Sequence, residues 1–181
     1  MEGLYFECKK CGNCCKTVGH IILTVYDIRQ ISNFLNINID VFLKEYCYIF
    51  RRSVYSNKIL SFVIDEISLK KQAKKCPFLK DNYCSIQNVK PLYCKNYPFI
   101  ASLEYLSYFR VNIKHCRGFD CGRFFMIDEI KNKLEDNNNQ YYNYNKEIIE
   151  MNYDWKQLFG NIYSYLIIEN ENIQEDELYR F

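Results

Sequence analysis

Four cysteines stand within eight residues near the start of the chain, in the run Cys8-Lys-Lys-Cys11-Gly-Asn-Cys14-Cys15. Cys8, Cys11 and Cys14 follow one another at intervals of three, and Gly12 supplies the backbone freedom with which such a loop can curl its thiolates around one centre. Cys15 breaks this regularity, because adjacent residues usually point their side chains in different directions. We therefore expect Cys15 to serve a second centre, or a different metal of a larger one.

Further cysteines lie far along the chain, in the stretch CPFLKDNYCSIQNVKPLYCKNYPF, which carries Cys76, Cys84 and Cys94. All three prolines of the protein fall in this stretch. Proline lacks a backbone donor and fixes its own torsion, so the sequence predicts an irregular wrap held by its ligands rather than a helix or a central strand. With Cys116 the candidate ligands number eight, enough for two four-cysteine centres: Cys8, Cys11, Cys14, Cys15, Cys76, Cys84, Cys94 and Cys116.

In these phrases the sequence resembles the YkgJ-type cysteine-cluster family, described as a zinc- or iron-chelating domain. Four phrases match in order over roughly residues 6–121: the C-x2-C-x2-C-C run, CPFL followed by C-x-I, K-P-x-x-C-x-x-Y-P-F, and the later Cys116. Family members usually carry Arg-Pro where this chain has Lys90-Pro91, a change that keeps the charge but loses the bidentate fork of arginine. The resemblance implies metal binding, and Cys47 and Cys121 lie outside its pattern.

The cysteine cluster is also similar to that of the flagellin lysine methylase, a longer protein that methylates lysine side chains. This chain carries no clear nucleotide or S-adenosylmethionine fingerprint and no Gly-x-Gly-x-x-Gly after a predicted strand. We therefore keep a protein-modifying enzyme only as an alternative. No catalytic residue is assigned, and whether the protein is an enzyme stays open.

The ligand type leaves the metal open, because all-thiolate sites suit both zinc and iron–sulfur clusters. Zinc ribbons usually present two C-x2-C knuckles, whereas here one loop gives three close thiols and single cysteines come from afar. This spacing favours one or two [4Fe-4S]-type clusters, in redox or structural service. The alternative is a structural zinc site in an interaction or nucleic-acid module.

Charge is distributed unevenly along the chain. Residues before Met126 include 19 basic and 10 acidic side chains, and residues after it include 5 basic and 12 acidic ones. Basic residues crowd the ligand phrases and would offset the negative charge of thiolate centres. Nucleic-acid binding is the alternative use of such residues, but the negative charge of the centres and of the acidic tail argues against this alternative. We expect a protein or redox partner instead.

The composition and the expected compartment both favour a metal-binding protein without a membrane role. The chain has 181 residues, 49% apolar and 25% charged, and no apolar run approaches the about 18 residues of a membrane span. The N-terminus lacks the features of a secretory signal, so we expect a cytoplasmic protein without a membrane role. Cytosolic thiols are kept reduced, which makes metal binding the expected use of the ten cysteines.

Secondary structure is predicted from local signals. A helix should begin after Thr24, with Asp27 completing its N-terminal cap and Ile28, Ile31 and Leu35 along one face. A short helix over residues 40–47 should place Cys47 on its apolar side, as a core residue rather than a ligand.

The next segment, residues 49–65, should form a hairpin that turns at Ser56-Asn57, and residues 106–113 a further strand. A helix from Ile127 should end at the Asn137-Asn138-Asn139 run, and another should begin after Asp154, with Gln157 three residues on.

The overall expectation is an α+β fold with an irregular, metal-organised core, short strands and flanking helices. Residues 1–126 would form the cysteine-cluster domain and residues 127–181 an acidic helical extension packed on it or on a partner.

Overall fold

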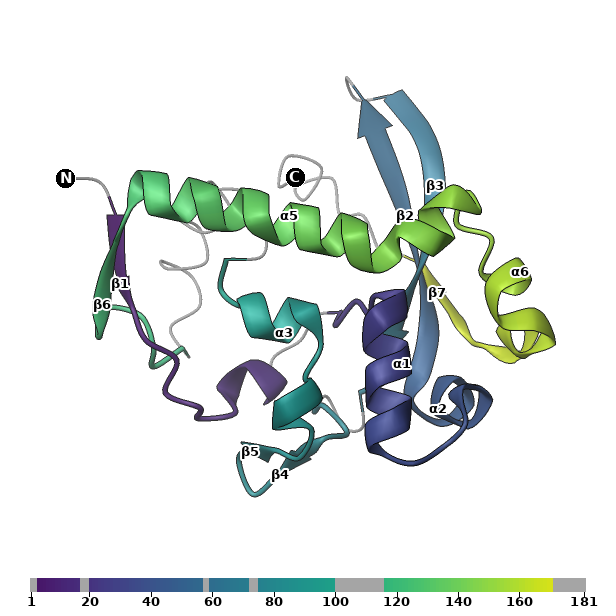
Figure 1. The fold of residues 1–181 in the computed structure, drawn as a ribbon, viewed down its shortest axis with the longest axis horizontal. Coiled ribbons are helices and arrows are strands. Elements are labelled where there is room, and N and C mark those ends of the chain that lie inside the picture. Colours follow the sequence, from purple (N-terminus) through teal and green to yellow (C-terminus); the bar gives the residue numbers. More distant parts are fainter. Residues whose placement is uncertain (1–2, 17–19, 57–58, 72–74, 100–115, 171–181) are drawn as a thin grey trace.

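A computed structural model describes residues 3–16, 20–56, 59–71, 75–99 and 116–170 (Figure 1). The long helix α5 (Ile127–Glu150) runs along the molecule (Figure 1). A small sheet of β1 (Gly3–Phe6) and β6 (Arg123–Met126) lies at one end of this helix, and the hairpin of β2 (Cys47–Ser56) and β3 (Ile59–Leu69) lies at the other. Helices and mostly antiparallel strands thus occur together, and the predicted α+β class is confirmed.

Helix α1 (Val25–Phe34) begins where the sequence predicts. The Thr24 side chain accepts a hydrogen bond from the Asp27 backbone, and the Asp27 carboxylate accepts one of 3.0 Å from the Thr24 backbone. Ile28 and Ile31 are fully buried. Helix α2 (Ile39–Tyr46) follows, and Cys47 directly after it is also fully buried, which confirms Cys47 as a core residue.

The predicted hairpin is confirmed and is longer than expected. Strand β2 (Cys47–Ser56) pairs antiparallel with β3 (Ile59–Leu69), from Cys47 opposite Leu69 to Ser56 opposite Ile59. A short strand from the end of the described chain, β7 (Ile168–Asn170), adds to β2 in parallel. The tail is therefore not purely helical.

The prediction that the helix from Ile127 ends at the asparagine run was wrong, since α5 continues to Glu150. Asparagine is a weak helix former, but contacts with distant segments override that preference. The Asn137 side chain donates to the Phe99 carbonyl. The buried Asn145 side chain accepts a hydrogen bond of 3.0 Å from the Val25 backbone at the start of α1.

The second predicted helix of the tail is α6 (Trp155–Phe159), and its predicted cap is confirmed by a bond of 3.0 Å from the Gln157 backbone to the Asp154 carboxylate. This helix is short, because Gly160 adopts φ +66° and the chain continues as the 3₁₀ helix η3 (Gly160–Tyr165).

Two hydrophobic cores hold these elements. The larger lies among α1, α2, β2 and β3, and the tail adds Ile148, Trp155 and Leu166 to it. The smaller lies under the β1–β6 sheet and contains Phe6, Phe99 and Ile130. The tail thus contributes to both cores, while its separation as a unit at residue 126 stays a prediction. The strand predicted at 106–113 lies outside the described residues.

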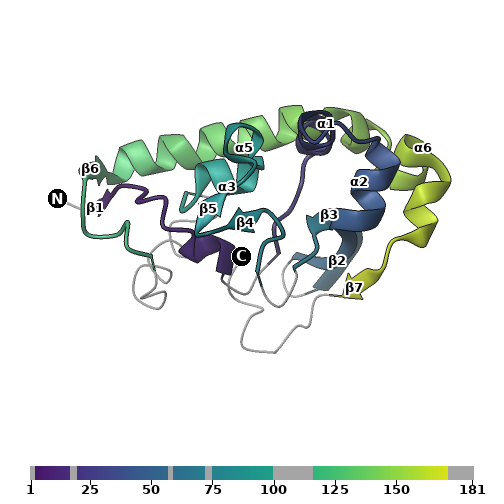
Figure 2. The same ribbon diagram turned by 90° about the horizontal axis from the view of Figure 1, so that it is seen from below.

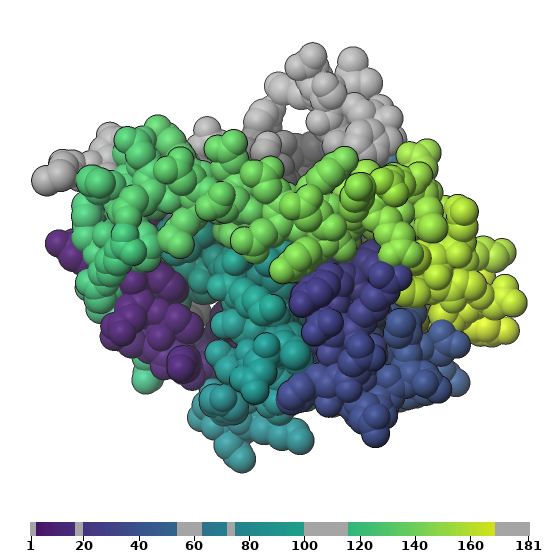
Figure 3. Space-filling model, viewed as in Figure 1, coloured from purple at the N-terminus to yellow at the C-terminus, as the bar shows by residue number. Residues whose placement is uncertain are grey.

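The region between the two ends is mostly irregular, as predicted, but the wrap also includes a short helix that the sequence did not predict. It contains the 3₁₀ helices η1 (Asn13–Lys16) and η2 (Gln87–Val89), the two-residue strands β4 (Leu79–Lys80) and β5 (Tyr83–Cys84), and the short helix α3 (Leu92–Asn96). Figure 2 shows α3, β4 and β5 between the β1–β6 sheet and the β2–β3 hairpin. In the space-filling view this segment borders α5 (Figure 3). Within the described residues, no helix is both long and apolar enough to cross a membrane.

Candidate metal centre

The N-terminal cysteine run packs against the turn between β4 and β5. Gly12 adopts φ +70°, and a Cβ there would lie 2.7 Å from the Asn82 carbonyl oxygen, so both the conformation and the contact require glycine. The Cys15 backbone N–H then donates to the Gly12 carbonyl at 3.0 Å. These contacts place Cys14 and Cys15, both in η1, over the Pro-rich wrap.

Three further cysteines, all in the Pro-rich wrap, lie near Cys14 and Cys15. The Cys76 backbone N–H donates to the Cys15 carbonyl at 2.8 Å, which joins the two cysteine segments directly. Cys84 lies in β5 opposite Leu79. Cys94 lies in α3, where its backbone N–H donates to the Pro91 carbonyl at 2.9 Å. We call Cys14, Cys15, Cys76, Cys84 and Cys94 the central thiol group.

Hydrogen bonds between thiols connect the first three members of this group. The bond to Cys15 and burial raise the pKa of Cys14. The bond from Cys14 lowers the pKa of Cys15, but its own bond to Cys76 and its burial outweigh that effect and raise the value to about 11. The bond from Cys15 holds the pKa of Cys76 below its ordinary value. The side chains of Cys14, Cys15 and Cys76 are therefore close enough to shift one another's pKa.

The remaining two thiols share the same electrostatic environment. Burial raises the pKa of both Cys84 and Cys94, and the neighbouring thiols raise it further. The Lys90 ammonium opposes this rise at Cys14, Cys84 and Cys94. Lys90 therefore sits where it can offset the charge of bound thiolates, the role expected of the basic residues near the ligand phrases.

The structure corrects the expected separation of Cys14 and Cys15. We predicted that adjacent side chains would point apart, but the two thiols are in hydrogen-bond contact and both lie near Cys94. The tight 3₁₀ turn closed by the Cys15–Gly12 hydrogen bond directs both side chains toward the wrap. Which centre each residue would serve stays a prediction.

The other predicted ligands lie elsewhere. The Cys116 thiol interacts with Cys11 and with the Tyr97 side chain, and burial raises its pKa. Cys8 is exposed, in the loop after β1. Cys121, which had no firm assignment from sequence, lies beside Lys9. We call Cys8, Cys11, Cys116 and Cys121 the end cysteines.

The donor chemistry of the central thiol group fits zinc or an iron–sulfur cluster, because both prefer thiolates. Across the described ranges, no three Cys, His, Asp or Glu side chains are already placed to hold one ion. The raised pKa values of Cys14 and Cys15 favour the protonated thiol at both positions. Since only thiolates bind metal, an entering ion would displace these protons and turn the sulfurs toward itself.

Two residues near the thiols gave no sequence signal. Lys71 lies beside Cys76, Cys94 and Cys15. Burial lowers the pKa of Lys71, and this effect outweighs the opposite effect of the three thiols. Tyr97 supports Cys116. Both contacts join residues that are distant in sequence, which no local pattern records. Lys74, Lys114 and His115, which the sequence places near the ligands, lie outside the described residues.

Asp27 links the helix cap to the metal region. Its carboxylate, 1% exposed, accepts from Thr24 through Oδ2 and from the Leu92 backbone N–H through Oδ1 at 3.0 Å. Leu92 is the first residue of α3, which carries Cys94. One side chain therefore caps α1 and fixes the start of α3. The sequence predicted only the first role.

Replacing Asp27 with alanine should lower the free energy of unfolding by about 2–4 kcal/mol, because it leaves buried backbone donors of Thr24 and Leu92 without partners. Urea unfolding of the metal-loaded protein measures this loss. Asp40→Ala, in the exposed first turn of α2, is the control and should cost under about 1 kcal/mol. Equal losses in the two variants would mean that the Asp27–Leu92 bond contributes little.

The clustered thiols supply the donor type that metal-chelating proteins use. A protein-family model, CxxCxxCC, with the description "putative zinc- or iron-chelating domain", matches residues 7–117. The chain belongs to this family, and the predicted membership is confirmed. The match ends before Cys121 and does not include the tail. No solved structure matches the chain.

Proposed function

We propose that the protein holds an iron–sulfur cluster, of the [4Fe-4S] type, on the central thiol group. The observation that carries this proposal is the meeting of five thiols from separate chain segments: the Cys76 backbone bonds to the Cys15 carbonyl, and each of the five side chains affects the pKa of another. Four of the five would suffice for one cluster. When bound, the cluster would supply one-electron redox chemistry or a structural crosslink.

The arrangement of these ligands favours a cluster over a lone zinc ion. Structural zinc sites usually combine two short loops with two ligands each, whereas here Cys76, Cys84 and Cys94 each come from a different turn of the wrap. Lys71 and Lys90 would offset the negative charge of the loaded centre. Burial of the Cys94 thiol would limit the access of water to it.

The biological setting follows as part of the proposal. Free thiols at this density suit the reducing cytoplasm, and a buried redox or structural centre would act together with a protein partner. The alternative is a zinc-organised interaction module, which the same thiolate chemistry would support.

Metal and acid-labile sulfide content, measured with an absorption spectrum on protein purified without oxygen, tests the proposal. We expect iron and sulfide in near-equal amounts, about four of each for the central centre, with a broad band near about 400 nm. Zinc without sulfide would show that the protein is a zinc-organised module and holds no cluster. Protein that binds neither iron nor zinc would contradict both forms of the proposal.

A further inference from the structure

The two loops that carry the end cysteines meet where the chain leaves β1 and where it enters β6. Beyond the strand pairing, the Glu7 backbone N–H donates to the Gly118 carbonyl at 3.0 Å, and the Asp120 backbone N–H donates to the Tyr5 carbonyl at 3.1 Å. Phe6 also forms an isolated bridge with Phe119. Residues 116–122 are therefore clamped onto residues 5–7, immediately before Cys8.

The two segments of this clamp approach each other too closely for a side chain at either glycine of the 116–122 segment. A Cβ at Gly118 would lie 2.7 Å from the Glu7 carbonyl oxygen, and a Cβ at Gly122, which has φ +77°, would lie 2.2 Å from the Glu7 Cβ. Glu7 precedes Cys8, and Gly122 follows Cys121. The backbones that carry Cys8 and Cys121 are thus held side by side.

Side-chain contacts pair the same two loops. Cys11 interacts with Cys116 at one end. Lys9, next to Cys8, contacts Cys121 at the other end. The Cys121 thiol points back into its own turn, donating to the carbonyls of Arg117 at 3.4 Å and Gly118 at 3.3 Å. The two loops that carry the four end cysteines therefore lie along one seam.

The spacing along this seam is that of a four-thiolate site. Cys8 and Cys11 form a C-x2-C loop, and Cys116 and Cys121 form a C-x4-C loop. Two facing loops with two to four residues between their cysteines are the usual source of ligands for a tetrahedral thiolate centre. This arrangement was not predicted from the sequence, because Cys8 and Cys11 also form the start of the longer cysteine run.

We propose that Cys8, Cys11, Cys116 and Cys121 form a second tetrathiolate metal centre, with Cys121 as a ligand that lies beyond the family match. This inference rests on the proposed function of the protein as a metal binder. The centre would join the N-terminal loop to the 116–122 turn. Lys9 lies on the N-terminal loop and Arg117 on the 116–122 turn, and both would offset the charge of the four thiolates.

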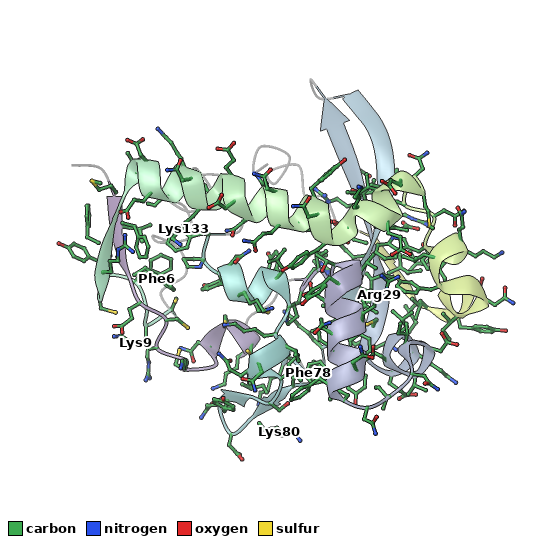
Figure 4. All side chains as sticks on the ribbon, viewed as in Figure 1. Phe6, Lys9, Arg29, Phe78, Lys80 and Lys133 are labelled. Atoms are coloured by element: carbon green, nitrogen blue, oxygen red, sulfur yellow. The ribbon has the colours of Figure 1, made fainter. Side chains whose placement is uncertain are left out.

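The two centres would occupy different places. Figure 4 shows Lys9 at the β1–β6 end, near Phe6, whereas Phe78 and Lys80 mark the wrap beside α1. Phe78 follows Cys76 by two residues and belongs to the larger core, and Phe6 belongs to the smaller one. Each centre would therefore lie against its own hydrophobic core, which makes separate loss of one metal possible.

Metal content per chain, measured on the full-length protein purified without oxygen, tests this proposal with three variants. Cys121→Ser should lose the metal of one centre and keep the other. Cys94→Ser should show the complementary loss. Asp120→Asn is the matched control in the same turn: Asp120 has φ +60°, which asparagine tolerates, and this variant should keep the metal content of the wild type.

Each outcome bears on a different claim. Wild-type metal content in Cys121→Ser would overturn the second centre. A single centre in the wild type, lost only in Cys94→Ser, would also overturn it while leaving the proposed function intact. Protein without zinc or iron would overturn both proposals. The ratio of zinc to iron and sulfide would identify the metal at each position.

A measurement without substitutions complements the variants. Cys121 is only partly buried, so its free thiol should be open to alkylation. In the metal-loaded protein we expect Cys8 and Cys121 to resist iodoacetamide, and after metal removal we expect both to react, as located by mass spectrometry. Rapid alkylation of Cys121 in the loaded protein would overturn its assignment as a ligand.

Discussion

Replacing Cys94 with serine is expected to remove the metal of the central thiol group and to lower the free energy of unfolding by about 3–5 kcal/mol. Cys94 lies near Cys14, Cys15 and Cys84, so its thiolate would connect the N-terminal run to the wrap. A structural metal contributes its binding free energy to folding. The loss should stay below that of a small zinc finger, because two hydrophobic cores remain.

Metal analysis and urea unfolding of the same preparations measure both effects. Cys47→Ala is the control, since Cys47 is fully buried in the larger core, where burial raises its pKa and the nearby Lys70 opposes that rise. It should keep full metal content and lose about 1–3 kcal/mol by cavity formation. Full metal content in Cys94→Ser would refute the assignment of Cys94 as a ligand.

Local signals in the sequence predicted the elements that depend on neighbouring residues. The capping of α1 by Thr24 and Asp27 and of α6 by Asp154 involves residues three apart, and the sequence displays both directly. The hairpin followed from β-branched and aromatic runs around a polar turn. Burial of Cys47 was also predicted, but from helical spacing, whereas the structure places this residue at the start of β2.

Contacts between distant segments were not visible in the same way. The continuation of α5 through its asparagines depends on Phe99 and Val25, and the position of α3 depends on Asp27. The sequence suggested eight ligands, and the proposed division of the cysteines into two groups rests on two long-range contacts. The bond from Cys76 to Cys15 builds the central thiol group, and the bond from Glu7 to Gly118 aligns the end cysteines.

Removing metal with a chelator, without oxygen, is expected to loosen the wrap at residues 76–99 while the β2–β3 hairpin and α1 stay folded. The wrap has mainly short local hydrogen bonds, such as Ser85 N–H to the Phe78 carbonyl at 2.8 Å. Ile28, Ile31 and Ile67, in contrast, are fully buried in the larger core. The wrap is also tied to distant segments by Phe78 and Ile86 in the larger core and by the Leu92–Asp27 bond, and the metal would add further long-range links through the cysteines.

Hydrogen exchange followed by mass spectrometry resolves this difference along the chain. Amides of the wrap should exchange about 10- to 100-fold faster after metal removal, a change of about 1.4–2.8 kcal/mol in local opening. The Leu92 amide should be the least affected of them, because its Asp27 partner belongs to α1 and needs no metal. The Leu23 amide, bonded to the Ile67 carbonyl, serves as the reference that should not change. Uniform acceleration across both regions would show instead that the metal holds the whole fold as one cooperative unit, and no acceleration in the wrap would place the metal elsewhere.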